Sequence, residues 1–328
     1  MLVSIIITNH NYCDYLGYAI DSALCQSYKH KEIIVVDDGS TDGSIKLIKS
    51  YGGRINSLLK DRGGHCSAVN AGFRISHGEI IFFLDADDYL LDHAIESLVS
   101  PHIKDKSVVK SQGYLSVVNR DGEPMGQRIP RKFDPPGNYC EEALLCGLHI
   151  FRHTYTSGNA WARSFLECVT PLPENRHVGA DGLLNSVSPL FGNLSNVDRA
   201  VAAYRVHGHN NGPVGTTFSF ESLKKRVDEQ ESNREFLVSW ANALGYSVPN
   251  DSWQSSNWHH VLRAHSLGLM NETYPNQRFN DLILSPFRTL RTNPVKRSGV
   301  FLLLSILWCL PRRAALTMAR NMLKLPKL

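Results

Sequence analysis

Three aspartates directly after a strand-like apolar run have the types and the spacing to bind a divalent cation. The run covers residues 79–84, and Asp85, Asp87 and Asp88 follow it. Carboxylate oxygens are the ligands that Mg²⁺ and Mn²⁺ prefer, and either cation also binds diphosphate oxygens. A cation held here could stabilise the negative charge of a departing diphosphate. The alternative is a solvated acidic loop that caps the next helix.

A second acidic pair, Asp37 and Asp38, follows the apolar run 32–36. A carboxylate at a strand end can accept hydrogen bonds from a nucleobase N–H or from ribose hydroxyls. The alternative is ordinary turn chemistry, because Asp and the following Gly39 both favour turns. The segment lacks the GxGxxG spacing of a dinucleotide-binding loop, which disfavours NAD as a ligand.

The elements that would position these aspartates alternate along the first 85 residues. Apolar, β-branched runs and helical spacing predict strands at 3–8, 32–36, 55–60 and 79–84 and helices at 14–27, 40–48 and 67–76. Such alternation is typical of an α/β fold with a mostly parallel central sheet flanked by helices. In these sheets ligands bind beyond the carboxyl ends of the strands, where both acidic groups lie.

The pattern weakens in the second third of the chain. Residues 108–118 are predicted to form a strand, and residues 120–139 a loop rich in Pro, Gly and charge. Residues 200–206 indicate a strand or the end of a helix, and amphipathic spacing predicts helices at 220–244 and 253–269.

Four segments together resemble glycosyltransferase family 2, whose members have the GT-A fold. They are VSIIITNHN (3–11), EIIVVDDGSTD (32–42), GGHCSAVNAG (63–72) and GEIIFFLDADD (78–88), in the family's order and spacing. The resemblance extends from residue 1 to about residue 210. It implies a nucleotide-diphospho-sugar transferase with a GT-A type sheet. The amphipathic spacing after residue 215 separately predicts a helical C-terminal extension.

The resemblance implies donor-binding roles for residues at the rim of the sheet. Thr8 and His10 match the first loop of the base pocket, where an aromatic residue is commoner than a histidine. Asp38, with Asp37 beside it, matches the aspartate that binds the nucleobase. Asp85 matches the residue near the ribose.

Further donor-site positions follow from the same resemblance. Asn70 and Gly72 match the helix behind the donor site, and His65 stands where Gln or Lys is commoner. Ser157 and Asn159 lie in a segment that resembles the one beside the donor sugar and the acceptor. For that segment the alternative is a turn before a helix.

The resemblance also implies the reactive groups. Asp87 matches a metal ligand, and His207 matches a histidine close to the metal or the diphosphate; imidazole binds Mn²⁺ acceptably. Asp181 matches the catalytic base of the family. An inverting transfer needs such a carboxylate to take the proton of the attacking acceptor hydroxyl. The alternatives are a helix N-cap for Asp181 and a surface histidine without a function for His207. Zinc at His207 and His209 would lack a third ligand with suitable spacing.

Composition and charge favour a globular protein with a basic tail. The chain has 42% hydrophobic and 20% charged residues and a net charge of +4. Nine basic residues and no acidic one follow Asp281, whereas 26 basic and 31 acidic residues occur up to that position. The apolar segment 300–310 would span roughly 16 Å as a helix, about half of a bilayer's hydrocarbon. We therefore expect the tail to lie on an anionic membrane surface. The alternatives are docking on the protein's own core and, with less support because no such motif is present, nucleic acid.

Seven scattered cysteines without a CxxC pair indicate a reducing compartment and argue against a zinc site or a disulfide framework. The N-terminus lacks the basic and apolar regions of a signal peptide. We therefore expect a cytoplasmic protein, peripheral at the inner face of a membrane.

These observations predict three parts of the chain. A GT-A domain at 1–215 comprises a nucleotide-binding half (1–100) and an acceptor and catalytic half (101–215). A helical extension follows at 216–284, and a basic amphipathic membrane-associating tail at 285–328.

The expected activity is an inverting transfer of one sugar that uses Mn²⁺ or Mg²⁺. The donor would be a nucleotide diphosphate sugar, with UDP as the expected nucleotide, and the acceptor a hydroxyl of a glycan or a lipid-linked molecule, in cell-surface or exopolysaccharide assembly. Single addition is favoured because the sequence lacks the QxxRW motif and the spanning helices of processive synthases. The rivals are a sugar nucleotidyltransferase, which needs a Gly-rich basic loop after the first strand, and a non-catalytic membrane-associated scaffold.

Overall fold

The computed structural model describes residues 1–146, 151–174, 179–208, 210, 220–248, 314–315 and 317–318 of the chain. The chain divides into two compact units, one of residues 1–140 and 151–214 and one of residues 141–150 and 215–328. The three-part division expected from the sequence stays a prediction. The helix predicted at 253–269 and the apolar segment 300–310 lie outside the described residues.

The N-terminal half of the first unit alternates strands and helices as the apolar pattern predicts. In chain order the elements are β1 (Val3–Asn9), α1 (Cys13–Leu24), β2 (Lys31–Asp38), α2 (Ser44–Ser50), the 3-10 turn η1 (Gly52–Arg54), β3 (Asn56–Lys60), α3 (His65–Ile75) and β4 (Ile80–Asp85). The seven strands and helices predicted for this region are confirmed, with ends that shift by a few residues.

The second half is less regular. It contains β5 (Tyr89–Leu90), α4 (Ala94–Lys104), β6 (Val108–Val118), β7 (Pro124–Ile129), η2 (Thr156–Gly158), β8 (Asn159–Ala162), α6 (Arg163–Val169), α7 (Ala180–Val187), η3 (Ser188–Leu190) and β9 (Asn193–Arg205). Helix α5 (Cys140–Cys146) begins at the last residue of the first unit's stretch 1–140, and its residues 141–146 belong to the second unit. In the second unit, helix α8 (Phe220–Ala243) confirms the helix predicted at 220–244.

The prediction of a loop at 120–139 is wrong for residues 124–129, which form β7 beside β6. Five of the six residues of β7 are exposed. An exposed strand needs no apolar alternation, so the periodicity that reveals buried strands is missing here.

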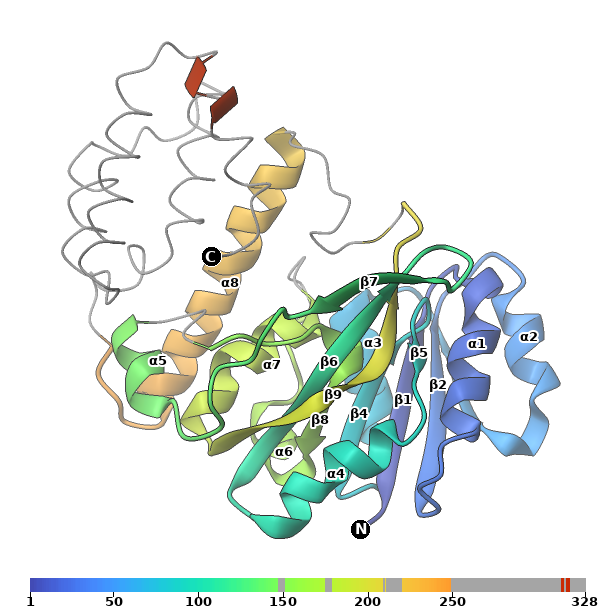
Figure 1. The fold of residues 1–328 in the computed structure, drawn as a ribbon, viewed down its shortest axis with the longest axis horizontal. Helices are drawn as coiled ribbons and strands as arrows, with labels where there is room; N and C mark the ends of the chain where they lie inside the picture. Colours follow the sequence, from blue (N-terminus) through green and yellow to red (C-terminus); the bar gives the residue numbers. More distant parts are fainter. Residues whose placement is uncertain are drawn as a thin grey trace. The chain divides into compact units, whose positions relative to one another are not determined.

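The strands of the first unit form one sheet in the order β3-β2-β1-β4-β8-β6-β9-β5, with β7 paired to β6 (Figure 1). Strands β1 to β4 are all parallel, and β6 runs parallel to β9. Strands β5, β7 and β8 pair antiparallel with their neighbours. The α/β prediction is confirmed, and the alternation of strands and helices accounts for the parallel strands β1 to β4 but not for the parallel pair β6 and β9.

Side-chain alternation along β1 divides the core between the two faces of the sheet. Ile5 and Ile7 belong to a buried cluster that includes residues of α1, α2 and α4. Ile6 points to the other face, where α3 packs on β1 and β2. A Cβ on Gly72 of α3 would overlap with Ile6 Cγ2 and lie 3.1 Å from Val36 Cγ2. The absence of a side chain at Gly72 therefore sets how closely α3 approaches the sheet.

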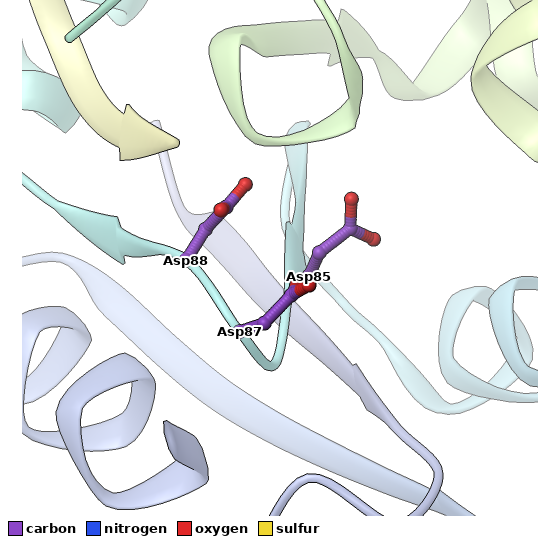
Figure 2. A group of neighbouring side chains, drawn as sticks. All are labelled: Asp85, Asp87 and Asp88. Atoms are coloured by element: carbon purple, nitrogen blue, oxygen red, sulfur yellow. The ribbon is translucent and has the colours of Figure 1, made fainter. Parts of the chain in front are cut away.

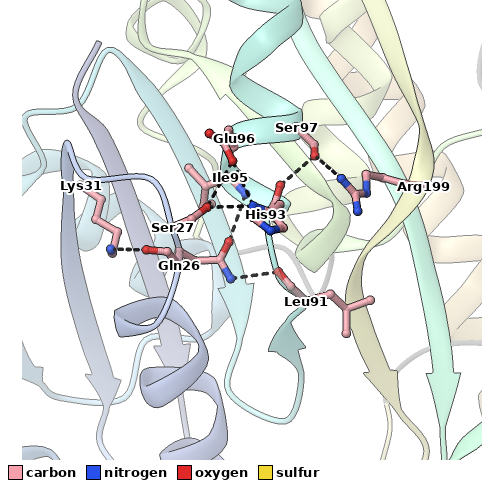
Figure 3. A network of polar contacts seen from close by, with 9 residues as sticks. All are labelled: Gln26, Ser27, Lys31, Leu91, His93, Ile95, Glu96, Ser97 and Arg199. Carbon is pink, nitrogen blue, oxygen red and sulfur yellow. Dashed lines mark hydrogen bonds and ion pairs between the residues drawn. The ribbon is translucent and has the colours of Figure 1, made fainter.

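A network of polar contacts anchors the chain just after the Asp85–Asp88 turn (Figure 3). Gln26, beyond the end of α1, donates to Leu91 O (2.9 Å) and accepts from Ile95 N–H (3.3 Å). His93, at a φ of 61°, precedes α4 and contacts Glu96 at 3.1 Å. These contacts fix both ends of the connection from β5 to α4.

Replacement of Gly72 by Ala should lower the free energy of unfolding by about 1–3 kcal/mol, net of the higher helix propensity of Ala. Urea denaturation measures the change. The matched control is Gly53→Ala, because nothing lies within 4 Å of a Cβ added at Gly53. Equal stability of the two variants would show that α3 tolerates a wider spacing from the sheet.

Candidate active site

The carboxyl ends of β1, β2 and β4 meet at one rim of the sheet. Thr8 of β1 is in register with Asp85 of β4, and Asn9 is in register with Asp37 of β2. Asp38 ends β2 next to Lys60, the last residue of β3. The two acidic groups predicted from the sequence therefore lie at the same edge.

Asp38 is held as a buried carboxylate by three donors. Lys60 Nζ (2.6 Å) and Gly63 N (2.9 Å) donate to Oδ1, and Gly64 N (2.7 Å) donates to Oδ2. Burial would raise the pKa of Asp38, but these donors outweigh it and hold the pKa below its usual value. A carboxylate has about four acceptor positions, so roughly one remains for a ligand N–H.

Asp37 shapes the turn that follows β2. Its carboxylate accepts from Asn9 Nδ2 (2.8 Å) and from Ser40 N (2.9 Å), and the residue is fully buried. The turn chemistry left open by the sequence is therefore present at Asp37, and its contact with a donor stays a prediction.

His10 is tied to the same strand end. Its Nδ1 lies 2.9 Å from Asp38 O. Because a carbonyl oxygen only accepts, Nδ1 carries the proton, and Nε2 can accept from Asn11 Nδ2 at 3.3 Å. Thr8 is 8% exposed at the end of β1. The base-pocket roles of Thr8 and His10 stay predictions, and both residues lie at the rim where such a pocket would be.

The turn after β4 gathers three carboxylates (Figure 2). Asp85, Asp87 and Asp88 each offer an oxygen within 4.8 Å of the others. Asp88 is 1% exposed and accepts from Ser157 Oγ (2.6 Å) and from Arg205 N (3.0 Å). Asp88 thus closes the turn through η2 and β9, and leaves Asp85 and Asp87 as the more exposed pair.

Crowding and burial shift the titration of this cluster. Burial raises the pKa of Asp85 to about 7, the charges of Asp87 and Asp181 act in the same direction, and His65 opposes them. Burial and the neighbouring aspartates also raise the pKa of Asp88 well above its usual value. Negative charge is concentrated at this turn, and a hard cation with a preference for carboxylate oxygens fits this set of donors.

The two residues predicted as metal ligands are in contact. His207 Nε2 lies 3.0 Å from Asp87 Oδ2, and the His207 side chain is 2% exposed. The imidazole stacks on the ring of Tyr15 at 5.0 Å and meets Tyr12 edge-on at 5.6 Å. The aromatic rings of α1 and of the segment before it therefore fix the position of the imidazole.

Arg205 is a residue whose role the sequence reasoning missed. Its Nε donates to Asp87 O (3.1 Å), and a guanidinium N–H donates to Arg120 O (2.7 Å). Its guanidinium carbon lies 5.1–5.4 Å from three ring centroids, those of Tyr15, Tyr18 and Tyr89. An arginine at the end of the apolar run 200–206 was the available signal, because a buried arginine requires partners.

His65 lies between two carboxylate-bearing elements. Its Nδ1 accepts from Ala180 N–H at 3.2 Å, at the start of α7, and its Nε2 lies 3.6 Å from Asp85 Oδ1. His65 thereby links the first turn of α3 to the aspartate turn and to the helix that carries Asp181. Its contact with a donor stays a prediction.

Asp181 lies in the first turn of α7, after Gly179 as N-cap. Burial raises the pKa of Asp181, while His65 and Lys110 oppose the shift. A Cβ on Gly179 would lie 2.7 Å from Asp181 Oδ1, although Gly179 has an ordinary φ of −66°. The carboxylate therefore folds back over a residue that has no side chain.

Three predicted donor-site residues make structural contacts behind the rim. Asn70 donates to Leu172 O (2.8 Å) and to Glu174 Oε1 (3.0 Å), and accepts from Leu172 N (2.8 Å). Ser157 and Asn159 are fully buried, and Asn159 Nδ2 donates to the backbone of η2 and its N-cap. Direct contact of these three with a donor stays a prediction; in this structure they hold the elements that form the rim.

Comparison with known proteins agrees with this arrangement. Residues 4–165 match the family model described as glycosyl transferase family 2. Residues 4–165 of the chain therefore belong to this family. Among similar proteins, an uncharacterized glycosyltransferase of Nostoc sp. is 29% identical over 256 residues, 76% of this chain and 79% of the relative.

Other relatives share a shorter stretch. An uncharacterized glycosyltransferase of Rickettsia prowazekii is 42% identical over 115 residues, 34% of this chain and 36% of that protein. Chondroitin synthase of Pasteurella multocida is 35% identical over 156 residues, 46% of this chain but 16% of the synthase. The chain thus matches only a minor part of these two proteins.

Solved structures show the GT-A fold. TarS of S. aureus (residues 1–349) superposes with a TM-score of 0.53 at 17% identity, covering 99% of this chain and 90% of that one. The mannosyltransferase PcManGT of Pyrobaculum calidifontis, in complex with GDP-Man and Mn²⁺, has a TM-score of 0.50 at 17% identity, with 98% and 79% covered. At these identities the two structures support the fold alone, which is that of GT-A glycosyltransferases.

Asp87→Asn should abolish the part of a UDP-dependent thermal shift that requires Mn²⁺, because an amide is a neutral and weaker ligand. At 100 times its dissociation constant a ligand stabilises the folded state by about 2.7 kcal/mol, which a melting curve resolves. Asp92→Asn, an exposed aspartate outside the cluster, is the matched control. A Mn²⁺-dependent shift that survives in Asp87→Asn would exclude Asp87 as a ligand.

Proposed function

We propose that the protein transfers one sugar from a nucleoside diphosphate donor, with UDP as the nucleotide, to an acceptor hydroxyl with inversion at the anomeric carbon. One observation carries the proposal: Asp38, the expected nucleobase contact, lies at the same rim of the sheet as the Asp85–Asp88 cluster. The charge of Asp181 also acts on Asp85. TarS has also been solved with UDP-GlcNAc, and PcManGT with GDP-Man, which supports a nucleotide sugar as the donor class.

Asp87 and His207, with Asp85 beside them, are the residues that would hold Mn²⁺ or Mg²⁺. Their donor set of carboxylate oxygens and one imidazole suits these cations. When bound, such a cation supplies positive charge that stabilises the departing diphosphate. The chain itself keeps the turn in place, because Arg205 Nε donates to the backbone carbonyl of Asp87.

Asp181 is the proposed general base. Its carboxylate takes the proton of the acceptor hydroxyl while that oxygen forms the new bond to the anomeric carbon. The bond between the anomeric carbon and the diphosphate oxygen breaks in the same displacement, so the nucleoside diphosphate leaves from the opposite face. A carboxylate with a raised pKa is the stronger base, and burial provides that shift at Asp181.

Asp181→Asn should lower kcat by about 10²–10⁴-fold, the usual contribution of a general base, with the UDP and Mn²⁺ thermal shift unchanged. In the wild-type protein kcat/KM should fall as pH decreases through the pKa of Asp181, because the protonated form cannot accept a proton. Burial raises that pKa, so the fall should begin above the ordinary aspartate value of about 3.9.

Release of UDP from UDP-sugars in the presence of an acceptor glycan measures this rate. Gly179→Ala is a milder companion variant, because the added Cβ would displace the Asp181 carboxylate without removing it. Full activity in Asp181→Asn would show that another group is the base. Absence of any turnover by the wild-type protein would favour the non-catalytic scaffold.

We also propose that the protein is peripheral at the inner face of a membrane and acts on a lipid-linked or membrane-proximal acceptor. Among the residues that the structure describes, no helix is both long and apolar enough to cross a bilayer. Support comes from the nine basic residues after Asp281 and from the apolar segment 300–310.

Reversal of two tail charges, Arg312→Glu with Arg313→Glu, should lower the affinity for phosphatidylglycerol vesicles by at least about 30-fold, because each basic residue contributes about 1 kcal/mol to binding. Cosedimentation with the vesicles measures this affinity. The matched control reverses two exposed lysines of α2, Lys46→Glu with Lys49→Glu. Equal loss in both variants would point to net charge rather than to the tail.

A further inference from the structure

A lysine is buried in the core of the catalytic half. Lys110 on β6 is 1% exposed, and its Nζ donates to Gln112 Oε1 (2.8 Å) and to Asn185 Oδ1 (2.5 Å). The ammonium lies 5.1 Å and 5.4 Å from the ring centroids of Phe151 and Trp161. No carboxylate of the described residues forms an ion pair with it. Burial of a lysine with neutral partners is costly, so its presence requires a reason.

The second partner of Lys110 lies on the helix that carries the proposed base. Asn185 is four residues after Asp181 on α7, which places the two side chains on the same face, one turn apart. Asn185 is 4% exposed, and its Nδ2 is buried without a hydrogen-bond partner among the described residues. Two costly polar groups therefore meet one turn along α7 from Asp181.

The first partner of Lys110, Gln112, connects it to β9 and to the segment before η2. Gln112 Nε2 donates to Arg152 O and to Asn196 Oδ1, both at 2.9 Å, and Gln112 Oε1 also accepts from Thr154 N at 3.2 Å. The network thus joins α7 through Lys110 to β6, to β9 and to the segment before η2. His65 holds the start of α7, and Lys110 holds its next turn.

We propose that Lys110 is a positioning residue for the transfer: it fixes Asp181 by holding Asn185 of α7 against β6. The inference rests on the proposed role of Asp181 as the base. An apolar residue of similar length would fill the same space at a lower desolvation cost. The two hydrogen bonds of the lysine set the rotation of α7 about its axis and its position along β6. This matters because a displacement of about 1 Å at a reacting group costs on the order of 10²-fold in rate.

The test uses the full-length protein and the Lys110→Met variant, which keeps the length and the packing of the side chain. Nucleotide release is measured with Mn²⁺ and the UDP- or GDP-sugar that the wild-type protein turns over fastest. We expect kcat to fall by about 10–100-fold while the KM for the donor stays within about twofold, because the nucleotide side of the rim is unchanged. The melting temperature should stay within about 4 °C of wild type or rise.

The double variant Lys110→Met with Asn185→Leu separates positioning from stability. When Lys110 and Asn185 are both replaced by apolar residues, no buried amide oxygen at position 185 is left without a donor. Stability should therefore be kept even if Lys110→Met alone folds poorly. A stable double variant with a low kcat supports the proposal. Turnover at the wild-type level in either variant would overturn it, as would a higher KM for the donor without loss of kcat.

Asp181→Asn, measured in parallel, distinguishes the two ideas. Loss of turnover in Asp181→Asn with normal turnover in Lys110→Met would reject the role of Lys110 and leave the proposed function intact. Normal turnover in Asp181→Asn would reject the base assignment on which the inference rests.

Discussion

The repulsion among closely spaced carboxylates is the constraint on which the rest of this site depends. Three aspartates follow one strand, and their oxygens lie within 4.8 Å of one another. Donors from separate parts of the chain hold them: Ser157 from η2, the backbone of Arg205 from β9, and His207 from the segment after it. The long strand β9 and the short turn η2 are therefore as necessary to the cluster as β4, which carries it.

The balance between neighbouring carboxylates and neighbouring donors also explains why the anions of Asp38 and Asp85 differ in stability. Asp38 has a cationic partner and two backbone N–H groups, so it is stabilised as an anion. Asp85 has the side chains of His65 and Thr156 nearby but faces other carboxylates, so its negative charge is opposed. A carboxylate that the protein already stabilises as an anion suits recognition of a neutral N–H donor. A carboxylate whose anion is destabilised by its neighbours suits a site that gains a positive charge on ligand binding.

The parallel half of the fold and the position of its aspartates could be predicted because the signal is local. Buried parallel strands appear as continuous β-branched runs, and the residues that follow them must lie at the same edge. The roles of Asp88, Arg205 and Lys110 could not be predicted in this way. Asp88 meets Arg205 across 117 positions of sequence, and Lys110 meets Asn185 across 75. Such pairs depend on the order of strands in the sheet, which periodicity does not reveal. The exposed strand β7 was missed for the opposite reason, since it has no buried face to leave a pattern.

Helix α3 contacts two segments that lie more than 100 positions later in the sequence. The side chain of Asn70 makes three hydrogen bonds to residues 172–174, and His65 accepts one from the start of α7. Both contacts come from a helix that packs closely on β1 and β2. A chimaera that imports the 170–187 region from a relative would therefore have to import its counterparts of Asn70 and His65 as well. Grafts between members of this fold should follow the contacts of α3 rather than the boundaries of loops.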